Sequence, residues 1–264
     1  MEEEELSLTF WGHLEELRSV LIKTAVSILA VSLLSLYYSA ALLSLLTETL
    51  PPQEKLVILS PQEGFVSLFK LSLWAGFLFT TPYWLRLFLN FIRPALKGRK
   101  ALFLPGFLAL SLIFVTTGIL FALKFTLPLS NGYLYHFNET LGKNLWTLSH
   151  YLDYVWLLLV AHAAAFEAGA LLLSLIHLGI LKQETLAAKR RPAFIAALIL
   201  GALLTPPDVL TQIAIALPLY GFYELAILYG KITSPAHKLD RVCHDHPDTN
   251  ATLPSDGQTP RAAP

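Results

Sequence analysis

Charged residues are scarce in this sequence. Only 14% of its 264 residues are Asp, Glu, Lys or Arg, whereas soluble domains carry about 25%. Hydrophobic residues make up 55% of the chain, and the mean hydropathy is +0.56. The shortage of charge excludes an ordinary soluble domain and predicts an integral membrane protein with one domain.

Other absences narrow the class further. Cys243 is the single cysteine, so no disulfide can form within the chain. The acidic N-terminus, MEEEELS, lacks the basic segment of a cleaved signal peptide, so the first apolar run should act as an uncleaved insertion signal. P-loop, GxGxxG, HExxH and GxSxG motifs are all missing, which argues against a nucleotide site, nucleic-acid binding and hydrolytic catalysis. His244 and His246 stand near Cys243, but this spacing does not suit a closed zinc site, and we expect neither metal nor cofactor.

What the sequence does contain is a series of apolar runs separated by polar loops. It therefore predicts an all-α polytopic fold: a six-helix membrane domain at 10–230, after an acidic tail at 1–9 and before a disordered cytoplasmic tail at 231–264. The helices are expected at about 20–46, 66–92, 102–127, 151–180, 193–204 and 209–229, with a polar loop at 128–150.

The last two runs are short. At 1.5 Å per residue, 193–204 extends for about 20 Å, less than a hydrocarbon core of about 30 Å. Pro218 should kink the sixth helix. The pair is expected to form a short hairpin, with a re-entrant pair as the alternative. Asp208, directly after Pro206 and Pro207, is well placed to cap the sixth helix, and Gln212 follows one turn later.

The basic residues predict the topology. Almost all Lys and Arg outside the apolar runs lie in segments that should be on the same side of the membrane as the N-terminus. The loops on the opposite side hold only Lys55 and Lys143. By the positive-inside rule both termini are cytoplasmic. We find no internal repeat, which argues against an inverted-repeat transporter.

Four ionisable residues lie inside or beside the apolar runs. Glu167 is costly there unless paired, hydrated or protonated, so it is a functional candidate or a protonated structural group. His162 lies about 500° away around the helix, so we expect no coupling between the two. Glu63 and Lys70 share a helix face, where a mutual ion pair, a wet cavity or a snorkelling lysine would tolerate them.

The stretch Phe10–Leu21, FWGHLEELRSVL, has apolar residues at helical spacing and predicts an amphipathic helix that leads into the first run. It carries a charged cluster of His13, Glu15, Glu16 and Arg18. Such a helix acts either as an interfacial anchor or as a recognition site.

Several motifs, in order, resemble the TatC family, the multi-spanning subunit of the twin-arginine protein translocase. They are HLEELRSVL at 13–21, SPQEGFVSLFKLSL at 60–73, GFLFTTP at 76–82, FIRPAL at 91–96, FE at 166–167 and LLTPPDVLTQIAIALPLYGFYE at 203–224. The resemblance implies a cupped six-helix bundle in the bacterial cytoplasmic membrane that is a receptor and scaffold rather than an enzyme. It also implies binding of twin-arginine signal peptides of folded cargo, recruitment of single-span TatA and TatB type subunits, export driven by the proton-motive force, and a homo-oligomer within a hetero-complex.

The resemblance also assigns residues. Glu16 matches the family's signal-binding glutamate, His13 and Arg18 would orient the same surface, and Phe91 matches an aromatic position of the signal site. Glu167 would face the concave interior, and the docking side for partners would include Leu203, Leu204 and Pro206.

One loop departs from the family pattern. Relatives usually carry a second signal-binding glutamate after the PAL element, but PALKGRK at 94–100 has no acidic residue. We hypothesise that Glu15 or the Glu2–Glu5 run supplies this charge, although neighbouring residues on a helix point about 100° apart. Two alternatives stay open: a proton-coupled secondary transporter that uses Glu167, and a scaffold that has lost signal recognition.

Overall fold

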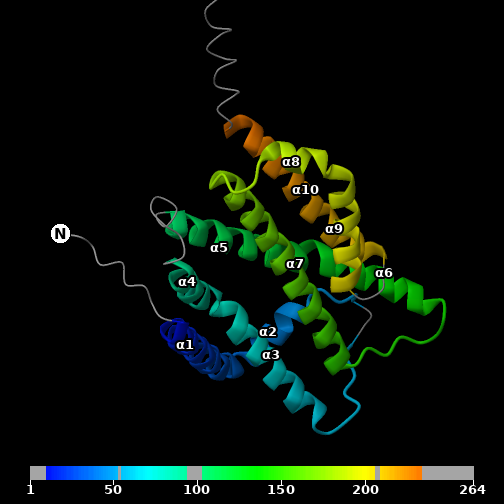
Figure 1. The fold of residues 1–264 in the computed structure, drawn as a ribbon. Coiled ribbons are helices and arrows are strands. Elements are labelled where there is room, and N and C mark those ends of the chain that lie inside the picture. Colours follow the sequence, from blue (N-terminus) through cyan, green and yellow to red (C-terminus); the bar gives the residue numbers. More distant parts are fainter. Residues whose placement is uncertain (1–9, 53–54, 94–102, 206–208, 234–264) are drawn as a thin grey trace, which may run out of the picture.

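The structure, a computed structural model, describes residues 10–52, 55–93, 103–205 and 209–233. These residues form α-helices and their connections, and the only β pairing among them is an isolated parallel bridge between Val57 and Thr147 (Figure 1). The predicted all-α class is therefore confirmed. The predicted tails at 1–9 and 231–264 fall largely outside the described residues.

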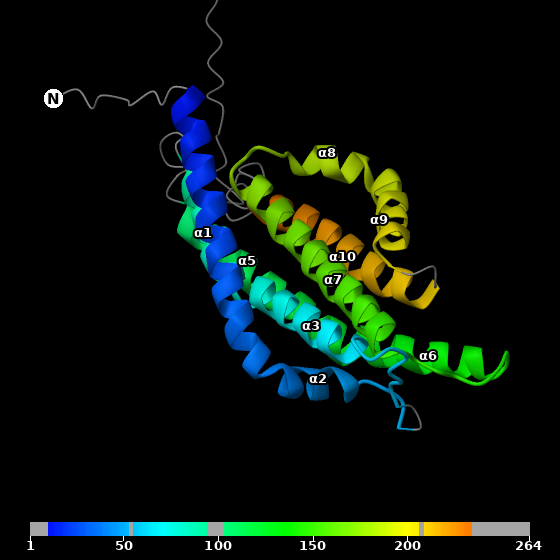
Figure 2. The same cartoon turned by 90° about the horizontal axis from the view of Figure 1, so that it is seen from below.

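The first helix is longer at its start and shorter at its end than predicted. α1 (Phe10–Tyr37) joins the amphipathic stretch and the first apolar run in one helix of 28 residues. The helix stops at Tyr38, whose φ of −97° and ψ of 11° leave the α-helical region. The chain then turns into α2 (Ser39–Thr47), which runs across the end of the bundle (Figure 2).

The second predicted helix is bent. α3 (Glu63–Phe79) and α4 (Thr81–Ile92) meet at an angle of 50° around Thr80. Pro82 lies in the first turn of α4 and has no N–H to donate, while the Thr80 hydroxyl donates to the Gly76 carbonyl at 2.8 Å. Both α3 and α4 pack against α1.

The third helix continues into the predicted loop at 128–150, and that part of the prediction is wrong. α5 (Leu104–Phe121), the π-helix η3 (Ala122–Thr126) and α6 (Leu127–Glu139) together span 36 residues. At 1.5 Å per residue this is about 54 Å. Pro128 lies in the first turn of α6, where its missing N–H costs least, and the π-helix relaxes the hydrogen-bond register just before it.

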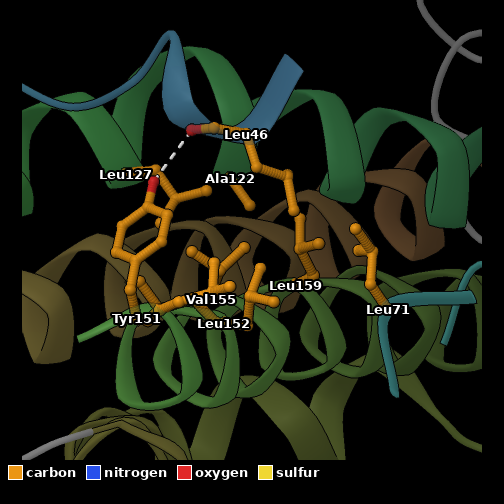
Figure 3. Close-up of a cluster of buried hydrophobic side chains, with 10 residues drawn as sticks. Leu46, Leu71, Ala122, Leu127, Tyr151, Leu152, Val155 and Leu159 are labelled. Atoms are coloured by element: carbon orange, nitrogen blue, oxygen red, sulfur yellow. Dashed lines mark hydrogen bonds between the residues drawn. The ribbon is translucent and has the colours of Figure 1, made fainter. Parts of the chain in front are cut away.

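α7 (Leu148–His177) is the centre of the fold and packs against α3, α5 and α10. Leu152, Leu158 and Leu127 are fully buried around it. Figure 3 shows this cluster, in which the Tyr151 hydroxyl donates to the Leu46 carbonyl at 2.8 Å and so ties α7 to α2.

The remaining helices form the other side of the bundle. α8 (Gln183–Ala188) lies within the basic loop, and α9 (Arg190–Leu204) and α10 (Val209–Thr233) form a hairpin (Figure 1). Pro218 lies inside α10, which continues on both sides of it.

Several helices are long and apolar enough to cross a membrane. Four single helices in the described part of the chain meet this criterion, and the bent pair α3–α4 raises the number to five if it counts as one span. α9, with 15 residues, extends for only about 22 Å. The protein is therefore multi-pass, and the sixth crossing stays a prediction.

Candidate functional site

Two predicted site residues meet where α4 packs against α1. The rings of His13 on α1 and Phe91 on α4 lie edge to face, with centroids 6.5 Å apart and planes at 88°. The two residues are far apart in sequence, and they meet because α4 packs against α1. His13 is exposed and Phe91 is half-buried, so the pair borders a surface that a ligand can reach.

The four residues of the charged cluster on α1, His13, Glu15, Glu16 and Arg18, divide between two sides of the helix. At 100° per residue, Glu16 lies about 60° from His13, whereas Arg18 and Glu15 lie about 140° and 160° from it. His13 and Glu16 therefore lie on one side of α1, where Glu16 is half-buried and His13 is exposed, and Glu15 and Arg18 are exposed on the other side. We call His13, Glu16 and Phe91 the α1–α4 lip. Arg18 and Glu15 stand beside this lip rather than in it.

The α1–α4 lip suits a cationic, planar group. A carboxylate at its edge can accept two parallel hydrogen bonds from a guanidinium, and aromatic rings favour a cation over their faces. Arg93, at the end of α4, is exposed. The loop at 94–100, where the family's second carboxylate is missing, lies outside the described residues.

Glu167 lies between α7 and α5. The Ser111 hydroxyl is 2.6 Å from both carboxylate oxygens, and Ser111 is fully buried while Glu167 is half-buried. His162 is held elsewhere, by the Thr126 hydroxyl at 2.9 Å and the Leu158 carbonyl at 2.8 Å. The expectation that Glu167 and His162 point to different faces agrees with these separate partners. Nothing in the sequence singled out Ser111, since a serine in an apolar run is common.

The suggested pairing of Glu63 with Lys70 is wrong. The Lys70 ammonium instead bonds both carboxylate oxygens of Asp153 on α7, at 3.1 and 3.2 Å. Glu63 accepts the backbone N–H groups of Leu59 and Ser149, at 2.7 and 3.0 Å, and so satisfies an unpaired donor in the first turn of α7. Sequence reasoning missed Asp153, although an acidic residue near the start of an apolar run was a usable signal.

The α9–α10 hairpin is tied by polar contacts and presents apolar side chains. Gln212 donates to the Leu198 carbonyl at 3.1 Å and so links α10 to α9. Leu203 is 75% exposed, whereas Leu204 packs against a buried cluster on α7 and α10. Two other predicted residues, Pro206 and Asp208, lie outside the described residues.

The junction of α8 and α9 carries an ion pair that the sequence did not indicate. Arg190 Nε lies 2.9 Å from Glu224 Oε1, and the Tyr220 hydroxyl donates to the same oxygen at 2.8 Å. Tyr223 donates to the Leu186 carbonyl at 2.6 Å. These contacts fasten the basic loop to α10. In the described part of the chain, no three His, Cys, Asp or Glu side chains are grouped to hold a metal ion, and Cys243 lies outside that part.

Comparison with known proteins places this architecture. The profile of the family described as Sec-independent protein translocase protein (TatC) matches residues 12–218. The protein of that name from Aquifex aeolicus (strain VF5) is 34% identical over 232 residues, covering 86% of this chain and 96% of the relative, and that from Escherichia coli (strain K12) is 28% identical over 224 residues, covering 83% and 86%. Two crystal structures of the twin arginine translocase receptor TatC, one of them in DDM, superpose with TM-scores of 0.69 and 0.71. They are 33% and 34% identical, cover 83% of this chain, and are themselves covered over 98% and 99%. This multi-pass helical bundle matches these proteins over most of its length, in both sequence and structure. The chain therefore belongs to the TatC family of Sec-independent protein translocase proteins.

Proposed function

We propose that this translocase subunit is the receptor for twin-arginine signal peptides and that the α1–α4 lip is its recognition site. The observation that carries the proposal is the meeting of His13 and Phe91 on the side of α1 that also holds Glu16. Three residues that the family resemblance assigned to one function thus come from two helices and one surface.

The lip provides chemistry for an arginine pair. The Glu16 carboxylate would accept two hydrogen bonds from one guanidinium, a geometry that lysine cannot reproduce. Phe91, half-buried and held against His13, offers an apolar wall for the side chain that follows the arginines. Glu15 points about 100° away from Glu16 around the helix axis. It would therefore act on the second arginine through its charge rather than by hydrogen bonds to the same guanidinium.

The α9–α10 hairpin is the proposed docking side for single-span partners. Its outer surface exposes large apolar side chains along both helices, among them Ile199, Leu203, Ile213 and Leu217. α9 is shorter than a bilayer core, so the lipid beside it must thin or be replaced by a partner helix. Leu203 belongs to this proposed surface, while Leu204 supports it from the inside.

In the proposed arrangement the protein spans the bacterial cytoplasmic membrane with both termini in the cytoplasm. The excess of Lys and Arg in the loops on one side supports this orientation. The lip then faces the compartment in which folded cargo waits. The proton-motive force would drive export after recruitment of the partners.

Export of a folded twin-arginine reporter, in cells that lack their own TatC subunit, tests the proposal. We expect the wild-type chain to restore export and a photo-crosslinker at position 91 to capture the signal peptide. Stable insertion without export and without crosslinking would refute the receptor assignment. Export without crosslinking at position 91 would refute the assignment of the lip.

A further inference from the structure

A groove runs between α5, α7 and α10 at the end of the bundle that carries the basic loops. It has a volume of about 560 Å³, and its wall is formed by Phe103, Leu110, Leu173, Leu225 and Leu228. Leu225 and Leu228 are about half exposed, so the groove opens on the outer surface of the bundle rather than into its core. An apolar groove of this kind on a multi-pass protein accepts an acyl chain.

A second, more polar cavity adjoins this groove. Its volume is about 740 Å³, and it shares His177 and Tyr229 with the apolar groove. It is also lined by Lys182, Gln183 and Glu184, which begin the basic loop just after the apolar run of α7 ends. The two cavities therefore adjoin, with an apolar end beside the apolar run of α7 and a charged end just beyond it.

His177 and Tyr229 form the border that the two cavities share. Tyr229 and His177 share a hydrogen bond of 2.7 Å between the hydroxyl and Nδ1, and the His177 ring stacks on Phe103 with centroids 4.9 Å apart. α8 lies close against α10. A Cβ added to Gly230 would be only 2.6 Å from the Cβ of Gln183. Gly179, with φ of 67°, makes the turn that sends the chain back over this end.

The charged end carries both signs. Gln183 donates to Glu184 Oε1 at 2.8 Å. The pKa of Glu184 is lowered by a hydrogen bond from its own backbone N–H, by the Gln183 bond and by the charge of Lys182, so this carboxylate is ionised at neutral pH. Lys182 supplies a cation two residues before it.

We propose that this composite site binds one zwitterionic glycerophospholipid with a primary-ammonium headgroup, its acyl chain in the apolar groove, its phosphate at Lys182 and its ammonium at Glu184. The complementarity of charge selects this occupant. An anionic headgroup such as that of phosphatidylglycerol brings no cation to pair with the Glu184 carboxylate, and a quaternary ammonium cannot donate a hydrogen bond to it. The proposal does not depend on signal-peptide recognition.

The test is native mass spectrometry of the full chain extracted from mixed vesicles of phosphatidylethanolamine, phosphatidylglycerol and phosphatidylcholine in equal parts. We expect one retained phosphatidylethanolamine. Gly106 lines the apolar groove and has no neighbour within 4 Å of an added Cβ, so Gly106→Phe should fill the groove and abolish retention. Gly221→Phe on α10, where an added Cβ also meets nothing within 4 Å, is the matched control and should leave retention unchanged.

A charge variant tests the headgroup separately. Glu184→Gln should lower the preference for phosphatidylethanolamine over phosphatidylcholine about fivefold, the effect of one partly exposed ion pair. The equivalent change at the exposed Glu139, Glu139→Gln, should not alter it. Equal retention of the three lipids by the wild type, or unchanged retention in both the Gly106 and Glu184 variants, would overturn the proposal.

Discussion

Neutralising Glu16 tests the proposed recognition site most directly. Glu16→Gln keeps the size of the side chain and its place on α1 but removes the charge that would hold a guanidinium. Glu15→Gln is the matched control. It removes the same charge from the preceding residue, which is exposed and turned away from Phe91.

The magnitude follows from the surroundings of the two carboxylates. Hydrogen bonds to charged groups contribute about 1.5–3 kcal/mol, and the partial exposure of Glu16 reduces this to about 1–2 kcal/mol. The dissociation constant for a twin-arginine peptide should therefore rise about 5- to 30-fold in the Glu16 variant. Glu15 acts only through screened charge across the helix, so its variant should change the constant by less than about twofold at 0.15 M salt.

Fluorescence anisotropy of a labelled twin-arginine peptide, with the purified chain in nanodiscs, measures both constants. A peptide with both arginines replaced by lysine sets the background. Equal losses in the Glu15 and Glu16 variants would refute the division of α1 into two sides, and an unchanged constant for Glu16→Gln would remove this residue from the site.

Three further predictions concern packing inside the bundle. Gly76→Ala would place a Cβ 2.8 Å from the Ile28 carbonyl oxygen, so α1 and α3 must separate. We expect the free energy of unfolding to fall by about 1–3 kcal/mol, visible as a lower midpoint of thermal unfolding. An unchanged midpoint would contradict this close packing. Ser111→Ala removes the donor to Glu167 and should cost about 1–3 kcal/mol in the same assay, whereas no change would mean that water replaces the hydroxyl. A double-mutant cycle of Lys70→Gln and Asp153→Asn should give a coupling below about 1 kcal/mol, because the side chains are 39% and 47% exposed; a larger value would indicate that lipid, rather than water, surrounds the pair.

Much of the architecture could be predicted from local patterns. The scarcity of charge and the length of the apolar runs identify a multi-pass helical protein, because each crossing must satisfy its own backbone hydrogen bonds in lipid. The shortness of 193–204 could be read directly, and α9 has 15 residues. The continuation of the third helix through Pro128 could not, because it depends on a change of hydrogen-bond register in the π-helix before it.

The candidate site was predictable residue by residue but not as a surface. Family motifs pointed to His13, Glu16 and Phe91 separately, yet only the packing of α4 against α1 shows that the rings of His13 and Phe91 meet. The partner of Lys70 was missed for the same reason, since Asp153 comes from a distant helix and helical periodicity reports only on neighbours within one helix.

The sequence by itself therefore determined the class of protein and its apolar segments, and its family motifs supplied the candidate site residues, because hydropathy and side-chain chemistry are local properties. The tertiary structure alone decided that the rings of His13 and Phe91 meet, where α3–α4 bends, and that the end of α7 forms a groove with α5 and α10. These features arise from packing between helices far apart in the chain, where backbone geometry and close contact, rather than composition, determine which side chains meet.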